Sequence, residues 1–322
     1  MTPAPDNPRN RRIATFALLS TCVFWGATFT WMKQGMEALA ADFPGTHETA
    51  LGAYFLLVRF ALACLLLPVF IPASLRTLNA ASWKWGFWVS LPFAIGFLLQ
   101  IIGLSQADVP PSQSAFLTSL FVVATPILSS LVYRRIPPLG VLVGVVLATT
   151  GAAFIQGPPQ GGLSLGAWLT IAAALVFGGH ILVTDVATKR APPMAVTMTM
   201  FLFSTLWMLL ALLVSPGGPA LLAPAALQTA ALDTSFLLMV SLCAVFATVI
   251  AMSVLNRWQK ELLPSRAAII YTAEPVFATL ISLFFSNRET LTVWLFFGAG
   301  MILAANLAAE LIRPRKPATT LP

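Results

Sequence analysis

The chain has 322 residues, of which 58% are hydrophobic and only 9% are charged, and its formal net charge is +7. Soluble domains carry about 25% charged residues, so this composition excludes an ordinary soluble domain and predicts a polytopic membrane protein. The basic residues are spread over the loops without interleaved aromatic residues, a pattern that argues against a nucleic-acid partner.

Ten apolar segments are long enough to be transmembrane helices, because a span needs about 20 apolar residues. The predicted fold class is therefore an all-α polytopic membrane protein with ten transmembrane helices. These segments lie at about 14–34, 49–71, 84–106, 112–132, 139–156, 164–187, 193–214, 234–256, 265–285 and 290–312. The connecting loops are short and rich in proline or glycine, so none of them could hold a soluble domain. Residues 1–12 and 313–322 are predicted to be tails.

The basic residues also predict an orientation. With ten spans and a cytoplasmic N-terminus, fifteen of the 18 basic residues fall on the cytoplasmic side. The exceptions are Lys33 and Arg288 on the outside, and Arg59 in mid-membrane. The positive-inside rule therefore predicts that both termini are cytoplasmic.

Short matches recur along the chain at a nearly constant spacing. Gln106 aligns with Gln259 at a spacing of 153 residues, and Pro126 aligns with Pro275 at 149. Such spacing predicts two repeats of five helices each, with the first at 13–156 and the second at 164–312. Because five is odd, the second repeat would enter the membrane from the opposite side. Many secondary transporters are built from inverted repeats of this kind.

A series of short apolar motifs follows in order over about residues 13–312. They are Phe24-Trp-Gly-Ala-Thr-Phe29, Arg59-Phe60, Ala115-Phe-Leu-Thr-Ser-Leu-Phe121 with Pro126, Glu274-Pro-Val-Phe-Ala278, Arg288-Glu289, and Gly298 with Leu303 and Glu310. With these motifs the chain resembles the drug/metabolite transporter superfamily, in particular its EamA-type carriers. The resemblance implies ten helices in two inverted EamA repeats, a location in the bacterial inner membrane, and a central cavity for the export of small metabolites or drugs.

The resulting functional prediction is a secondary transporter that exports small metabolites, such as amino acids, related amphipathic compounds or drugs, by alternating access. Import on the same fold is an open alternative, and a non-transporting structural or receptor-like membrane protein is another. The chain has no P-loop, HExxH or GxSxG motif, so neither ATP-driven transport nor an enzyme is predicted. No Cys/His spacing suits a metal, and no cofactor is expected. The expected partners are a small-molecule substrate, the lipid bilayer and protons, with the chain acting as a monomer or homodimer.

Glu274 is a carboxylate in the middle of an apolar segment, followed directly by Pro275. Intramembrane acids commonly mark transport pathways, so Glu274 is a candidate for proton coupling or for binding a substrate amine. Alternatively, Glu274 is a structural partner of Arg59, or it satisfies backbone groups that Pro275 leaves open.

Arg59 lies about ten residues into the segment 49–71, too deep for its charge to reach the membrane surface fully. Its planar guanidinium suits a carboxylate, so Arg59 is a candidate anion clamp. A structural ion pair, or a cap on helix-end carbonyls, is the alternative. The sequence leaves open whether Arg59 and Glu274 meet.

Five ring-bearing residues complete the titratable and aromatic candidates. His180 could be a titratable cavity group, or a neutral histidine that is hydrogen-bonded to a neighbouring helix. Trp25, Phe29, Tyr271 and Phe121 could form an aromatic wall for a planar or apolar substrate. Ordinary packing or lipid-facing positions are the alternative for each ring.

Several neutral polar residues could hydrogen-bond a substrate near the midplane, and Gln100 and Ser253 occupy equivalent repeat positions. The set comprises Gln100, Ser253, Asn256, Thr118 and Ser114. Hydrogen bonds between helices are the alternative role for these side chains.

Two prolines and a set of glycines have predicted mechanical roles. Pro126 and Pro275 are the candidate hinges for alternating access, with a static kink as the alternative. The glycines are expected to form helix-packing or dimer surfaces. They are Gly140, Gly144, Gly151, Gly298 and Gly300.

Overall fold

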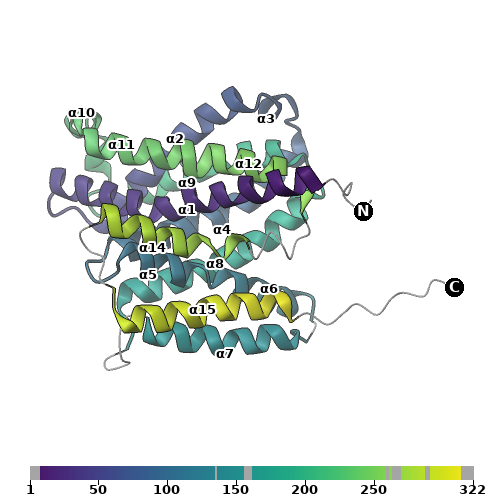
Figure 1. Ribbon diagram of the computed structural model, residues 1–322. Helices are drawn as coiled ribbons and strands as arrows, with labels where there is room; N and C mark the ends of the chain where they lie inside the picture. Colours follow the sequence, from purple (N-terminus) through teal and green to yellow (C-terminus); the bar gives the residue numbers. More distant parts are fainter. Residues whose placement is uncertain are drawn as a thin grey trace.

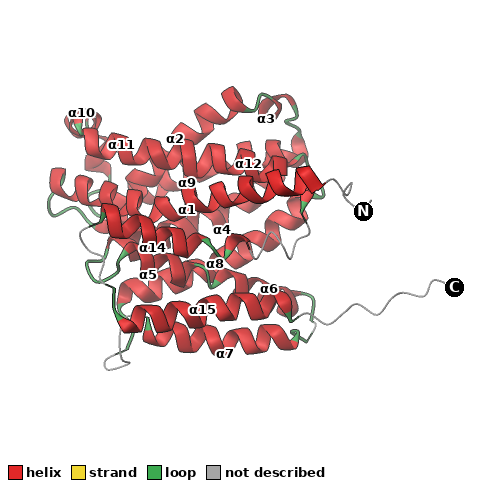
Figure 2. Ribbon diagram, viewed as in Figure 1, coloured by secondary structure: helices red, strands yellow, loops and turns green. Residues whose placement is uncertain are grey.

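The computed structural model describes residues 8–134, 136–155, 162–258, 261–262, 270–286 and 291–312. Within these residues the regular elements are helices, and strands are absent (Figure 2). In chain order they are α1 (Pro8–Asp42), α2 (Glu48–Phe70), α3 (Ala73–Arg76), α4 (Ala80–Ser105), α5 (Pro111–Thr118), α6 (Phe121–Val132), α7 (Leu139–Phe154), α8 (Leu165–Thr188), α9 (Pro193–Val214), the 3-10 turn η1 (Pro219–Leu222), α10 (Pro224–Leu232), α11 (Thr234–Leu242), the π-helical segment η2 (Cys243–Ile250), α12 (Ala251–Trp258), α14 (Glu274–Phe285) and α15 (Val293–Leu311).

Seven helices of the described ranges are long and apolar enough to cross a membrane. They comprise α1, α2, α4, α5 with α6, α8, α9, and α11 with η2 and part of α12. Three shorter apolar helices accompany them at Leu139–Phe154, Glu274–Phe285 and Val293–Ala309. An all-helical, multi-pass membrane protein is therefore confirmed, whereas the number of ten spans stays a prediction.

Helix α1 is longer than the sequence predicts at both ends. It begins at Pro8, inside the expected tail, and continues to Asp42 rather than ending near residue 34. Proline is favoured in the first turn of a helix because its missing N–H has no partner there in any case. The stretch after residue 34 is rich in alanine, methionine, leucine and glutamate, which favour helix. The helix stops before Gly45, which adopts a left-handed φ of 78°.

Helices α7 and α15 run side by side at one edge of the molecule (Figure 1). Gly151 and Gly298 face each other so closely that a Cβ on either would lie 2.7 Å from the other's carbonyl oxygen. Gly140 and Gly144 likewise face carbonyls of α15. These four glycines therefore pack two helices of the same chain, whereas Gly300 is exposed and no neighbouring atom lies within 4 Å of its added Cβ.

The two glycines of α15 provide a matched test of this packing. We expect Gly298→Ala to destabilise the protein by about 1–3 kcal/mol, because the new methyl group meets backbone atoms that cannot move aside. Gly300→Ala should leave the stability unchanged or slightly higher, because alanine favours helix. Thermal unfolding of the detergent-purified protein measures both variants. Equal unfolding temperatures would contradict the packing role of Gly298.

The interior is built around the short helix α5. All eight residues of α5 are buried, although the helix carries Ser112, Gln113, Ser114 and Thr118. One face of α5 joins the large apolar cluster of α1, α2, α4 and α9 through Ala115. A polar helix at the centre of an apolar bundle is unusual, since buried polar groups need hydrogen-bond partners.

Candidate substrate-binding region

Arg59 lies on α2 with only 2% of its surface exposed. Its Nε donates a hydrogen bond of 3.1 Å to Thr248 Oγ1 of η2, and its Nη1 lies 3.3 Å from Met32 Sδ of α1. The guanidinium carbon is 4.8 Å from the ring centroid of Phe97 on α4. Arg59 thus touches three other helices, through one hydroxyl, one thioether and one aromatic face.

The hydroxyl that receives Arg59 belongs to a stretch of π-helix. Thr248 Oγ1 itself donates to the carbonyl of Cys243, five residues earlier, at 2.9 Å. In the same stretch the carbonyl of Ala247 accepts a hydrogen bond of 3.0 Å from Trp25 Nε1. π-helical turns shift the backbone register and are frequent at functional sites. Here η2 offers acceptors to both Arg59 and Trp25.

Glu274 is the first residue of α14, directly after the turn at Thr272–Ala273. Pro275 fits the first turn because its missing N–H would have no helical partner there, and a carboxylate at a helix N-terminus is favoured by the helix dipole. Helix α1 approaches this point closely, since a Cβ on Gly26 would lie 2.9 Å from the Glu274 carbonyl oxygen. Glu274 is therefore held at a helix start against α1.

Arg59 and Glu274 do not form an ion pair with each other. Over the ranges that the structure describes, the ion pairs are Lys189–Asp185 and Arg257–Glu261. Arg59, which is buried, and Glu274, which is partly buried, are thus left without an ion-paired carboxylate or cation in this part of the chain. This arrangement disfavours the structural-pair interpretation of both residues.

The structure brings together only part of the expected aromatic wall. The rings of Trp25 and Tyr271 lie 5.9 Å apart, next to the start of α14. Phe29 instead belongs to the large apolar cluster, with 1% of its surface exposed. Trp25 and Tyr271 therefore lie together, whereas Phe29 packs in the core and Phe121 begins α6.

His180 on α8 is bonded on both sides of its ring. Nδ1 lies 3.2 Å from the carbonyl oxygen of Val89 on α4, and Nε2 lies 3.5 Å from Thr184 Oγ1. The ring of Phe93 lies 5.2 Å away. This is the geometry expected of a histidine that joins two helices. Among the described residues, His180 makes these contacts and none with Arg59 or Glu274. A transport role for His180 therefore stays a prediction.

The polar candidates separate into two groups. Gln100 Nε2 donates a hydrogen bond of 3.1 Å to Thr118 Oγ1, and both residues are buried between α4 and α5. Ser253 Oγ of α12 donates to the carbonyl of Val249, one turn earlier in η2, at 2.6 Å. The side chain of Asn256 lies outside the described residues. Gln100 and Thr118 thus form a polar contact in the interior, whereas the Ser253 hydroxyl is bonded to the backbone one turn earlier.

Comparison with known proteins now decides the class of this bundle. Residues 12–156 and 164–308 each match the model of the EamA-like transporter family. The chain belongs to this family. A relative from Archaeoglobus fulgidus, described as an uncharacterized transporter, is 30% identical over 304 residues, which cover 94% of this chain and 87% of the relative. A solved structure titled "Crystal structure of protein" is similar in fold, with a TM-score of 0.57, 15% identity, and coverage of 94% of this chain and 97% of that one.

The two halves of this EamA-family chain contain equivalent helix breaks. A turn at Ser119–Leu120 separates α5 from α6, and the turn at Thr272–Ala273 precedes α14, at a spacing of 153 residues. The helices that follow the two turns have 12 residues each. The first turn is held by Asn306 Nδ2 of α15, which donates to Ser119 Oγ at 3.1 Å.

The prolines, in contrast, are not placed alike. Pro275 lies in the first turn of α14, but Pro126 lies inside α6, which remains helical around it. The turn that interrupts the first helix lies at Ser119–Leu120, six residues or more before Pro126. Pro126 removes one N–H donor without ending the helix, and its hinge role, like that of Pro275, stays a prediction.

Lys33 is a buried cation whose contacts the sequence does not reveal. The sequence places it among the few outside charges, but the structure buries it in α1 with 2% of its surface exposed. Its Nζ donates to the carbonyls of Leu104 at 2.6 Å, Gln106 at 2.5 Å and Val109 at 3.2 Å. These carbonyls end α4 and lead into α5, so Lys33 caps the junction between these helices.

We expect Lys33→Met to destabilise the protein, because the variant leaves buried carbonyls at this junction without their donor. Each unsatisfied buried group costs about 1–3 kcal/mol, so the unfolding temperature should fall by several degrees or more. Lys84→Met, at an exposed position of α4, is the matched control. An unchanged unfolding temperature for Lys33→Met would show that water or other groups replace the ammonium.

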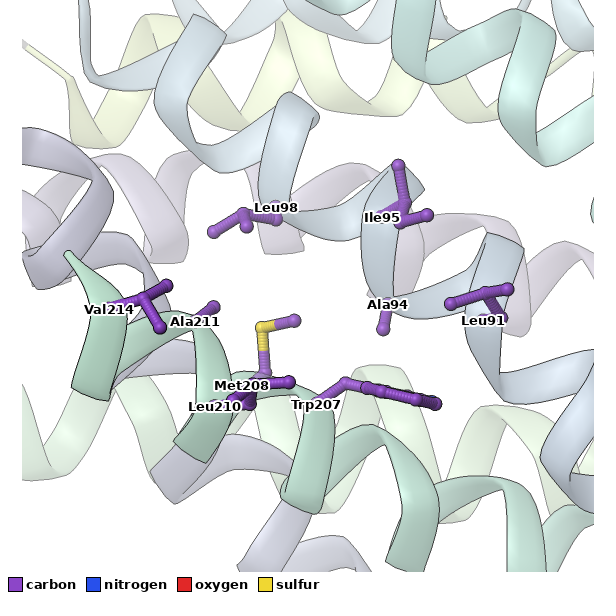
Figure 3. Close-up of a pocket in the computed structure, with 9 residues that line it drawn as sticks. All are labelled: Leu91, Ala94, Ile95, Leu98, Trp207, Met208, Leu210, Ala211 and Val214. Carbon is purple, nitrogen blue, oxygen red and sulfur yellow. The ribbon is translucent and has the colours of Figure 1, made fainter.

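One apolar groove lies on the surface shared by α4 and α9. Figure 3 shows this groove of about 220 Å³, lined by side chains such as Leu98, Met208 and Val214. The one polar group of this lining, Trp207 Nε1, donates to Ser90 Oγ at 3.0 Å. This groove thus offers no free side-chain hydrogen bond to a ligand. The polar candidate of α4, Gln100, faces α5 instead.

Proposed function

We propose that the chain is a secondary transporter that exports a small carboxylate-bearing metabolite, such as an amino acid or a related amphipathic compound, across the bacterial inner membrane. The observation that carries this proposal is Arg59, a buried cation of a transporter-family bundle that has no ion-paired carboxylate among the described residues. An uncompensated charge in a membrane bundle is costly and is commonly retained for function. A substrate carboxylate would supply the missing charge, and the guanidinium fork suits it.

In this proposal the chain crosses the membrane ten times, as two inverted five-helix repeats at 13–156 and 164–312. The two family matches, the three shorter apolar helices and the equal spacing of the helix breaks support the arrangement. In addition, α1 begins and α15 ends at the same end of the bundle (Figure 1), as an even number of crossings requires. The basic loops favour cytoplasmic termini.

Transport by alternating access would let the repeats move against each other around Arg59. Glu274, at the start of α14 beside Trp25 and Tyr271, is the proposed site of proton coupling. Intramembrane carboxylates serve as proton relays in many transporters. The substrate carboxylate and the coupling carboxylate would thus be bound by separate groups.

A flux screen in proteoliposomes tests the proposal. Purified protein is reconstituted and assayed with amino acids, nucleosides and cationic drugs, with and without a pH gradient, against protein-free vesicles. We expect flux of carboxylate-bearing compounds and little flux of nucleosides or cationic drugs. Flux in sealed vesicles of known protein orientation separates export from import. Absence of all flux from well-folded protein would favour a non-transporting, structural or receptor-like role.

A further inference from the structure

Helices α4 and α9 lie side by side and run in the same direction, with residues 117 positions apart in contact. Thr199 Oγ1 donates a hydrogen bond of 2.8 Å to the carbonyl of Ser82, and Trp207 Nε1 donates one of 3.0 Å to Ser90 Oγ. Both pairs have this spacing of 117 residues. The same spacing therefore indicates which residues of the two helices face each other farther along.

Small side chains open the groove between these helices. Ala94 and Ala211 also have the spacing of 117 residues, and both line the groove. Two turns earlier on α4 the space is filled by Phe87, whose ring lies 5.4 Å from that of Phe203 and 5.6 Å from that of Trp207. Two alanine methyl groups thus leave about 220 Å³ open between the helices (Figure 3).

The walls of the groove lie on the outer surface of the bundle. Ile95 is 43% exposed, Leu210 is 50% exposed and Val214 is 75% exposed. These positions belong to helices long and apolar enough to cross the membrane. Because the bilayer core holds no water, the occupant of an apolar groove at this depth is hydrocarbon.

The exposed face of α4 leads from a basic residue to the groove. Positions spaced alternately by four and three residues share one face of a helix. On α4 they are Lys84, Trp88, Leu91, Ile95 and Leu98. Lys84 and Trp88 are exposed, and the other three line the groove. At about 1.5 Å of rise per residue, the groove spans about 10–21 Å from Lys84 along the helix.

Two tryptophans indicate the depth of Lys84 in the membrane. Trp83 and Trp88 are both exposed beside it, and tryptophan is enriched where the membrane meets water. We therefore expect Lys84 at the level of the lipid head groups. One leaflet contributes half of the hydrocarbon core, or about 15 Å, so an acyl chain that starts at this level extends into the groove.

A second cation lies at the same end of the two helices. The guanidinium carbon of Arg190 is 5.1 Å from the ring centroid of Trp85, the residue next to Lys84. Arg190 is exposed, and a guanidinium that stacks on a ring keeps N–H groups at its edge for a phosphate. The neighbouring acid, Asp185, is ion-paired with Lys189 at 2.5 Å. The charges of Lys84 and Arg190 therefore make this end positive.

We infer that this face of α4 and α9 binds an anionic phospholipid. The groove takes one acyl chain, and Lys84 and Arg190 bind the phosphate. Basic residues near the membrane surface attract anionic lipids, and a phospholipid joins the required charge to a chain long enough to reach the groove. The ligand is a lipid of the surrounding bilayer and not a transported molecule, so the site goes beyond the proposed function.

Binding of defined lipids to the full-length protein, washed free of native lipid in detergent, tests this site. The probes are dioleoyl phosphatidylglycerol, dioleoyl phosphatidylcholine, and dihexanoyl phosphatidylglycerol, whose chains are too short to reach the groove. Lipid-dependent thermal stabilisation gives an apparent Kd for each lipid. For the wild type we expect the long-chain phosphatidylglycerol to bind at least about fivefold more tightly than either of the other lipids.

The charge of the site is tested by the double variant Lys84→Gln/Arg190→Gln. Its preference for dioleoyl phosphatidylglycerol over dioleoyl phosphatidylcholine should fall below about twofold. The matched control, Arg12→Gln/Arg134→Gln, removes two exposed cations elsewhere and should keep the wild-type preference. Without lipid, both double variants should unfold close to the wild-type temperature, because exposed side chains contribute little to stability.

The groove is tested by Ala211→Phe, which fills it with a ring. Both dioleoyl lipids should bind about fivefold more weakly or worse, because the chain loses its apolar contacts, whereas dihexanoyl phosphatidylglycerol should bind as it does to the wild type. Ala304→Phe, at an exposed position of α15, is the matched control. If Ala211→Phe fails to fold, Ala211→Met fills the same space with a flexible side chain.

Three outcomes would overturn the lipid site. Equal binding of the two dioleoyl lipids to the wild type would show that charge does not select the ligand. A preference for phosphatidylglycerol that survives in Lys84→Gln/Arg190→Gln would place the anionic site elsewhere on the protein. Unchanged binding of both dioleoyl lipids to the folded groove variant would show that the acyl chain lies outside the groove. Since flux is not measured, the lipid site and the proposed transport function stand or fall separately.

Discussion

Arg59→Gln is expected to lower the transport of carboxylate-bearing substrates by about thirtyfold or more. Removing one member of a buried charge pair costs about 2–5 kcal/mol, and 1.4 kcal/mol corresponds to a factor of ten. The loss should appear mainly as weaker binding, because the guanidinium is the proposed carboxylate site. Initial rates of flux in proteoliposomes over a range of substrate concentrations measure it.

The same variant separates transport from folding. Since Arg59 has no ion-paired carboxylate within the described residues, its replacement should leave the unfolding temperature nearly unchanged. Arg190→Gln, at an exposed arginine that stacks on Trp85, is the control for loss of a cation elsewhere. If Arg59→Gln or Arg59→Leu failed to fold while Arg190→Gln folded normally, a structural role for Arg59 would replace the proposed one.

Glu274→Gln is expected to uncouple transport from the pH gradient. A gradient of one pH unit stores about 1.4 kcal/mol per proton, which can sustain about a tenfold concentration ratio of a coupled substrate. Glutamine keeps the shape of the side chain but cannot bind and release a proton. The variant should therefore exchange substrate between equal concentrations yet show no gradient-driven accumulation.

The control for this prediction is Glu37→Gln, at an exposed carboxylate of α1. Accumulation of labelled substrate is followed with and without an imposed pH gradient for both variants. Gradient-driven accumulation by Glu274→Gln at the wild-type level would show that protons, if they are coupled, use another group.

The sequence predicts the elements of this fold well because each span must satisfy its own backbone in the membrane. Composition and segment length suffice to predict the helices, and the short motifs indicate the family. The break at Ser119–Leu120 has no local signal, since neither residue disfavours helix strongly. It depends on contacts from elsewhere, such as the hydrogen bond from Asn306. Likewise, nothing in the composition of residues 243–250 marks them as π-helix.

The candidate site was predictable in part. Arg59 and Glu274 stand out as charges in apolar segments, and the structure describes both within the bundle. Lys33 does not stand out, because a lysine near the end of an apolar segment is usually solvated there, and only the packing of α4 and α5 buries it. The partners of a side chain are tertiary facts, and sequence spacing does not reveal them.

The glycine contacts between α7 and α15 constrain how the molecule can open. These two helices come from different halves of the chain, and at Gly151 and Gly298 one backbone rests on the other. Ile302 packs beside Gly151, and Phe154 of α7 packs against the rings of Trp294 and Phe297 of α15. Separation of the two helices would therefore expose both backbones and these side chains to lipid. Any opening that keeps these contacts must rotate the rest of the molecule about an axis along the α7–α15 contact. The largest displacements would then occur in the helices that lie farthest from α7 and α15.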